Sequence, residues 1–205
     1  MIISLDGPAA SGKGTIARGI ANRLGFEHLD SGLFYRAYPD IVGDGDPGSI
    51  DQYIEAFKSI STNALRDERH AQRAAVVASS PIVRDFVTEV IRTAAQRLDK
   101  RGSGVVLDGR DIGTVVFPDA DVKLFITASV EARANRRYEE MKLRRPDVTL
   151  AEIENDLRRR DERDRNREVA PLVPAADAMV IDTSALGKDE AIAAAIEAVE
   201  EALGK

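Results

Sequence analysis

Residues 7–15 read Gly7-Pro8-Ala9-Ala10-Ser11-Gly12-Lys13-Gly14-Thr15, and this stretch decides the fold. It has the G-x-x-x-x-G-K spacing of a phosphate-binding loop, in which backbone N–H groups surround phosphate oxygens and the lysine reaches the β- and γ-phosphates. The apolar run Met1–Asp6 predicts a buried strand before the loop, and Ile16, Ile20 and Leu24 recur at helical spacing after it. A loop between a strand and a helix N-terminus favours anion binding over an ordinary glycine-rich turn.

One position of the loop departs from the common pattern. Gly14 follows Lys13 where many such loops carry a Ser or Thr whose hydroxyl binds magnesium. The metal ion must then be held mostly by phosphate oxygens and waters, and a carboxylate is needed to orient those waters. Asp108 follows the apolar run 105–107, where this fold needs the acid. We therefore predict Mg²⁺ as a cofactor that Asp108 holds through water, with no direct protein ligand.

The composition excludes several classes of protein. The chain has 205 residues, no cysteine, two histidines and a net charge of −6. This length fits one α/β domain, and the lack of cysteine excludes a disulfide framework or a thiolate metal site. The acidic balance argues against general nucleic-acid binding. No leader or membrane-spanning run is evident, so we expect a cytoplasmic monomer without nucleic-acid or membrane partners.

Apolar runs alternate with helical periodicities along the chain, which is typical of a parallel sheet covered by helices. Further strands are expected at Phe26–Leu29, Val105–Asp108, Val122–Ile126 and Met179–Asp182, with a turn at Lys100–Gly104. Capping boxes at residues 49–52 and 149–152 predict the starts of two helices. A third helix is expected to end near Ser80 and a fourth to span about 82–98. The last helix carries the apolar residues from Ile192 to Leu203. The breakers Pro39, Gly43, Gly45, Pro47 and Gly48 predict a loop before residue 49. We predict an α/β fold of the P-loop NTPase class with about five parallel strands.

Five stretches together resemble bacterial cytidylate kinases: GPAASGKGT, residues 29–37, residues 79–84, residues 107–129 and residues 158–184. The resemblance covers nearly the whole chain. It is weakest between Tyr38 and Asn63, where the family has a larger, β-containing insertion and this sequence is short and helical. The chain contains no Asn-Lys-x-Asp stretch, which excludes GTPase chemistry. Gly14-Thr15 after the lysine is itself typical of nucleoside monophosphate kinases.

The resemblance implies a kinase of pyrimidine nucleotide metabolism that moves the γ-phosphoryl group of ATP to CMP or dCMP, giving ADP and CDP or dCDP. It implies a single domain, with a core of about 1–37, 82–136 and 165–205. An NMP-binding insertion would span about 38–81 and a lid about 137–164. Residues 133–167 hold eleven Arg and one Lys against nine Asp and Glu, an excess of +3 in an acidic chain, as a lid over phosphates requires.

The same resemblance assigns the acceptor side of the site. Arg36 and Arg110 would bind the acceptor phosphate, with Ser31 and Tyr35 beside the acceptor nucleotide; Tyr35 could equally fill the core. Arg160 and Asp164 would face the sugar hydroxyls and Arg167 the phosphate or base. Arg133 and Arg137 would join loop residues 7–15 in binding ATP, and the catalytic groups would be Lys13, Arg36, Asp108, Arg110, Arg160 and Arg167.

Base selection follows from hydrogen bonding. The cytosine edge offers an amino donor beside ring and carbonyl acceptors, so a reader needs one carboxylate and one cationic donor. Asp111 and Arg84 match that pair. Uracil would place a carbonyl against the carboxylate, so CMP should be preferred to UMP. Ala75 replaces a family serine that helps to bind the base, a loss worth about 0.5–1.5 kcal/mol.

Two other functions stay open at this point. A P-loop kinase for UMP, AMP or a small metabolite is supported by the short insertion and by Ala75. A non-catalytic ATP-binding regulatory module is opposed by the acceptor-side cations, for which a sensor of ATP has no evident use. The sequence leaves the preference between CMP and dCMP undecided.

Overall fold

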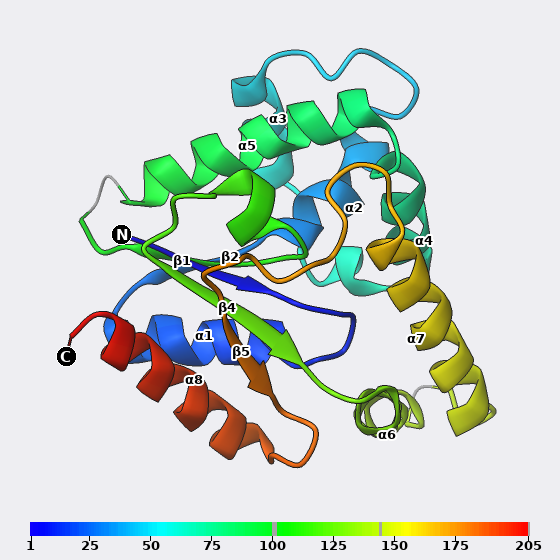
Figure 1. Cartoon of the computed structure of the whole chain (residues 1–205). Helices are drawn as coiled ribbons and strands as arrows, with labels where there is room; N and C mark the ends of the chain where they lie inside the picture. Colours follow the sequence, from blue (N-terminus) through cyan, green and yellow to red (C-terminus); the bar gives the residue numbers. More distant parts are fainter. Residues whose placement is uncertain (100–101, 144, 205) are drawn as a thin grey trace.

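Five parallel strands form the sheet, in the order β2-β3-β1-β4-β5 (Figure 1). The computed structural model describes residues 1–99, 102–143 and 145–204. The strands are β1 (Ile2–Asp6), β2 (Glu27–Asp30), β3 (Val105–Asp108), β4 (Val122–Thr127) and β5 (Met179–Asp182). All five lie where the sequence predicts them, with β2 shifted by one residue from the predicted 26–29. The predicted turn at 100–104 falls partly outside the described residues.

Helices cover both faces of the sheet because every strand between β2 and β5 is buried on both sides. On one face α1 (Lys13–Leu24) and α8 (Lys188–Ala202) pack against Ile3, Leu5 and Val106. On the other face α5 (Pro81–Asp99) packs with α2 (Ser31–Ile41) and α3 (Ile50–Lys58) against Val105 and Leu107 (Figure 1). Successive residues of β3 therefore enter different cores, as the period of a strand requires.

All the regular structure in the segment between α2 and α5 is helical, as its sequence predicts, and the predicted loop lies at residues 42–49. The segment holds α3, a short 3₁₀ turn η1 (Ala64–Arg66) and α4 (Glu68–Val77). The capping box at the start of α3 is present, with the Ser49 hydroxyl accepting from the Gln52 N–H at 3.2 Å. The expected break at Pro39 is wrong, because α2 continues through it to Ile41. The helix ends two residues later, so few hydrogen bonds are lost beyond the proline, and Ala37 and Tyr38 are buried in the packed cores on either side.

Two further helices extend from the carboxyl edge of the sheet. These are α6 (Val130–Met141) and α7 (Leu150–Arg165), the second starting at the predicted capping box of Thr149 and Glu152. They form a separate apolar cluster that includes Ile153, Leu157 and Ala9 of the phosphate loop. Figure 1 shows α7 running from α6 to α4, so this pair of helices connects the loop to the insertion.

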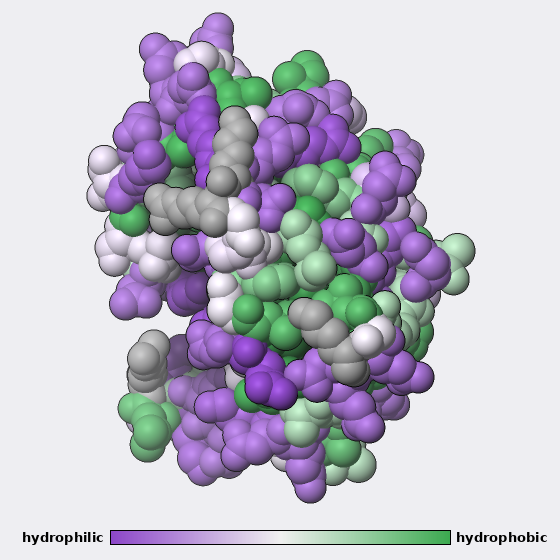
Figure 2. Space-filling model, turned by 90° about the vertical axis from the view of Figure 1, so that its left-hand side faces the viewer, coloured by the Kyte–Doolittle hydropathy of each residue, from purple (hydrophilic) through white to green (hydrophobic). Residues whose placement is uncertain are grey.

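Because all five strands are parallel, their amino ends lie on one side of the molecule and their carboxyl ends on the other. Both termini lie on one side, at the amino ends of the strands, and hydrophilic and hydrophobic residues are mixed there (Figures 1 and 2). A short π-helical turn, η2 (Ile112–Val116), links β3 to β4. None of the helices in the described part of the chain combines the length and apolar character needed to cross a bilayer.

Candidate active site

A cavity of about 1110 Å³ opens at the carboxyl ends of the strands. This edge is where ligands bind in open α/β sheets. The cavity is lined by the phosphate loop, the ends of β2 and β3, the insertion and α7. Every site residue predicted from the sequence lines it except Gly7, Pro8 and Arg133.

The phosphate loop has the backbone conformation that its glycines allow. Gly7 has φ 148°, and a Cβ on it would lie 2.0 Å from the carbonyl oxygen of Ile126, so no other residue fits. Gly12 has φ 91° and precedes the first turn of α1. The buried Ser11 hydroxyl has no hydrogen-bond partner among the described residues. An unpartnered buried donor beside a helix N-terminus fits a bound phosphate.

Lys13 is buried at the base of the cavity. Its ammonium donates to the carbonyl oxygen of Pro8 at 2.9 Å. Burial and, after it, the charge of Arg110 lower the pKa of Lys13 to about 7, although Asp108, Asp6 and Asp30 oppose the shift. A polyanionic ligand would favour the charged form of this lysine.

Asp108 lies at the end of β3, next to the loop. Its Oδ1 accepts from the His28 imidazole, with Nε2 at 2.7 Å, and its main-chain carbonyl accepts from the Ser31 hydroxyl at 2.8 Å. Its Oδ2 faces Gly14, 3.6 Å from the position that a Cβ would take there. Ser31 is thus a buried support of the site, a role that its sequence position did not predict.

Arg84 and Asp111 form a buried ion pair at the insertion side of the cavity. The Arg84 guanidinium also lies over the ring of Tyr35, with its Cζ 5.7 Å from the ring centroid. Ala75 lines the same part of the cavity. The two groups expected to read a base are therefore adjacent, and Tyr35 flanks them.

Four further guanidinium groups line the cavity, and two of them, Arg110 and Arg160, are paired with carboxylates. Arg110 donates from Nε to Asp164 at 3.0 Å, and Arg160 is paired with Glu68 of α4 and with Asp156, the latter at 2.8 Å. The pair of Arg160 with Glu68 joins α7 to the insertion. No sequence pattern points to Glu68, because the contact depends on how α7 lies against α4.

Among the described residues, Arg36 and Arg167 form hydrogen bonds only to main-chain carbonyls. Arg36 donates to the Leu65 carbonyl at 3.2 Å and Arg167 to the Ala170 carbonyl at 2.6 Å. Neither has a carboxylate within ion-pair distance in the described part of the chain, and the Arg167 Nε is buried without a partner. Burial lowers the pKa of both side chains. Two partly desolvated cations that make no ion pair with a carboxylate of the described chain fit an anionic ligand.

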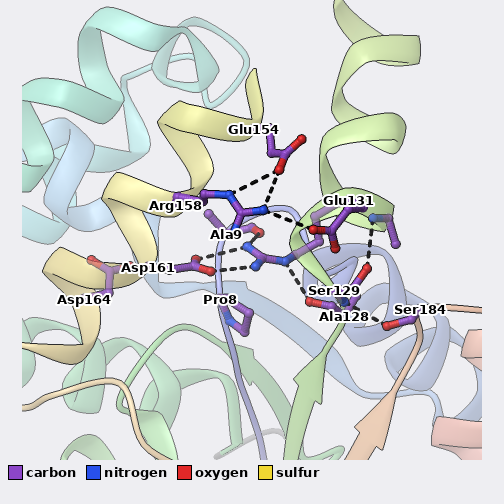
Figure 3. A network of polar contacts seen from close by, with 12 residues as sticks. Pro8, Ala9, Ala128, Ser129, Glu131, Glu154, Arg158, Asp161, Asp164 and Ser184 are labelled. Atoms are coloured by element: carbon purple, nitrogen blue, oxygen red, sulfur yellow. Dashed lines mark hydrogen bonds and ion pairs between the residues drawn. The ribbon is translucent and has the colours of Figure 1, made fainter. Parts of the chain in front are cut away.

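Arg133 lies elsewhere than predicted. This residue is 1% exposed and does not line the cavity. Its guanidinium donates to the Ala9 and Ala128 carbonyls and twice to Asp161, at 3.0 and 2.6 Å. Figure 3 shows Asp161 on α7 pointing toward Ala9 of the loop. Arg133 therefore ties the loop to α7 instead of reaching a ligand. Arg137 does line the cavity and pairs with Glu140 at 3.2 Å.

Asp6 is a second support that the sequence did not reveal. Its two carboxylate oxygens accept the N–H groups of Ile112 and Gly113, each at 2.8 Å. Burial raises the pKa of Asp6 to about 6. These bonds connect the end of β1 to η2, directly behind Asp111. A polar residue at the end of an apolar strand was the only available signal.

Comparisons with known proteins agree with this geometry. The family model described as cytidylate kinase matches residues 3–60 and 49–201. The chain is 46% identical over 214 residues to a cytidylate kinase of Azorhizobium caulinodans, with 100% of both chains covered. It is 48% identical over 202 residues to a cytidylate kinase of Paramagnetospirillum magneticum, covering 95% of each. The crystal structure of shikimate kinase from Bacteroides thetaiotaomicron superposes with a TM-score of 0.54 at 13% identity, covering 100% of this chain and 99% of that one, which shows a shared fold.

Proposed function

Because the chain belongs to the cytidylate kinase family, we propose that it transfers the γ-phosphoryl group of ATP to CMP or dCMP, giving ADP and CDP or dCDP. The observation that carries this proposal is the lining of one cavity. The phosphate loop and Lys13 line it together with Arg36, Arg110 and Arg167. A triphosphate on the loop and a phosphate on these arginines would therefore lie in the same cavity.

The reaction joins an oxygen of the acceptor phosphate to the γ-phosphorus while the bond from that phosphorus to the β-phosphate oxygen breaks. The acceptor oxygen is already an anion at neutral pH, so no general base is needed. Catalysis then depends on positioning and on cations around the transferring group. Lys13 would neutralise the β- and γ-phosphates, and removing one such group costs about 3–4 kcal/mol at the barrier.

Magnesium would supply charge neutralisation on the donor phosphates. Among the residues that the structure describes, no three His, Cys, Asp or Glu side chains gather as a metal site. Asp108 has one carboxylate oxygen toward Gly14, where it would accept a hydrogen bond from a water bound to the metal. The donor set therefore fits a metal that takes most of its ligands from phosphate and water.

The acceptor would bind in the half of the cavity that faces the insertion. Its phosphate suits Arg36, Arg110 and Arg167. The Arg84 and Asp111 pair suits the donor and acceptors of the cytosine edge, and Tyr35 offers a flat surface beside it. Arg160 and Asp164 on α7 would reach the sugar hydroxyls. Closure of α6 and α7 would exclude water, and with it hydrolysis of the γ-phosphoryl group.

The test is a coupled assay of ADP release with CMP, dCMP, UMP, AMP and shikimate as acceptors. CMP or dCMP should be turned over best, and Lys13→Met should abolish transfer, whereas the exposed Lys58→Met should leave it unchanged. Turnover of UMP or AMP well above CMP would support a kinase for another acceptor. Transfer that survives loss of Lys13 would contradict the whole assignment of the site.

A further inference from the structure

The side chain of His28 contacts the carboxylate that the proposed reaction uses. His28 lies on β2, and the parallel register places it opposite Val106 and places Asp30 opposite Asp108. Its imidazole therefore reaches diagonally to the next strand, where Nε2 lies 2.7 Å from Asp108 Oδ1. The side chains are 16% and 11% exposed, so water competes little for this bond. Neither the phosphate-loop pattern nor the acceptor-side motifs require a histidine at this position.

This contact gives the two oxygens of Asp108 different surroundings. Oδ1 accepts the imidazole N–H, while Oδ2 remains on the side of Gly14, at the first turn of α1. The Ser31 hydroxyl donates to the main-chain carbonyl of Asp108 at 2.8 Å. Asp108 is thus fixed both at its backbone and at one carboxylate oxygen, and Oδ2 is the oxygen on the side of Gly14, which lines the cavity.

We infer that His28 is a positioning residue: it holds Asp108 so that Oδ2 orients the waters of a magnesium ion on the bound triphosphate. This inference rests on the proposed function. Because Gly14 has no hydroxyl, the orientation of the ion depends on Asp108 more than it would in a loop with Ser or Thr there. Neutral imidazole with its proton on Nε2 suffices for this role. Partners that fix a metal-directed side chain contribute about 10–100-fold in metal affinity or activity.

Two substitutions separate positioning from simple support. His28→Leu fills the space without a donor, and His28→Gln returns an N–H near the place of Nε2. Calorimetry should measure ATP affinity with Mg²⁺ and again with EDTA. We expect His28→Leu to lose about tenfold in the affinity for ATP with Mg²⁺ and little in EDTA, with a matching rise in the Mg²⁺ concentration at half-maximal rate. His28→Gln should recover most of both losses.

Glu27→Gln is the matched control, since it lies on the same strand with its side chain on the opposite face of the sheet. It should leave both affinities unchanged. Equal losses with and without magnesium, or no loss in His28→Leu, would overturn the inference. A wild-type protein that does not phosphorylate CMP would contradict the proposed function, while the comparison of ATP affinities would still decide the role of His28.

Discussion

Nucleotide binding should take up a proton at Lys13. In the ligand-free protein the pKa of this lysine is about 7, because the side chain is buried and Arg110 adds a second positive charge nearby. A bound triphosphate favours the protonated form and raises the pKa toward the ordinary value for lysine. At pH 8 about nine-tenths of the ligand-free molecules hold a neutral Lys13, so ATP binding should take up about 0.9 proton. Near pH 6 the uptake should fall to about 0.1 proton.

The same shift sets the pH dependence of affinity. Since the bound state holds more protons than the free state above pH 7, affinity must fall as the pH rises through that range. The slope approaches about tenfold per pH unit between pH 8 and pH 9, and flattens below pH 7 where Lys13 is charged in both states.

Calorimetry of ATP binding in two buffers of different ionisation enthalpy measures the uptake directly. Lys13→Arg is the control, because a guanidinium stays protonated throughout this range, and its titration also records any proton exchange by ATP itself. The uptake should disappear in this variant. A wild-type binding heat that is the same in both buffers at pH 8, or an uptake that persists in Lys13→Arg, would refute the reasoning.

Three other substitutions test separate contacts. Asp161→Ala leaves the buried Arg133 without its carboxylate and should cost about 3–5 kcal/mol of folding free energy. The melting temperature should fall by about 10 °C. Glu154→Gln removes one partner of the more exposed ion pair with Arg158 and should change the melting temperature little. Ala75→Ser should tighten CMP binding several-fold, by about 0.5–1.5 kcal/mol, and an unchanged Kd would remove residue 75 from base binding. Asp111→Ala should lower kcat/KM for CMP more than for UMP, by about tenfold or more, and equal losses would show that Asp111 does not read the base.

The fold could be predicted because its signals are local. Four of the five strands, β1, β3, β4 and β5, are short and mostly apolar runs that end in polar residues, and strands alternate with helices along the chain. Both capping boxes start helices because the side-chain and backbone bonds close within four residues. Pro39 misled because a local signal for chain breaking competes with burial of the residues around it, and burial was stronger.

The direction of long side chains could not be predicted in the same way. Arg133 is part of an arginine-rich stretch, and nothing in its neighbours says that it turns back under the loop toward Asp161. The bond of His28 to Asp108 depends on the register of β2 against β3, and the pair of Arg160 with Glu68 depends on where α7 crosses α4. These contacts join segments far apart in sequence. The sequence therefore shows which types of side chain are present but does not show which of them pair.

The pattern of pairing among the arginines indicates how the site separates its tasks. Arg84, Arg110 and Arg160 each have a carboxylate partner, so their charge is largely balanced before any ligand binds. Arg36 and Arg167 have only carbonyl partners in the described chain, and both are partly buried. An uncharged acceptor would leave these two cations uncompensated, whereas a phosphate dianion would balance them. We therefore expect Arg36 and Arg167 to favour a phosphorylated acceptor, with Arg110 beside them at the phosphate, and we expect Arg84 and Arg160 to bind its base and sugar by hydrogen bonding.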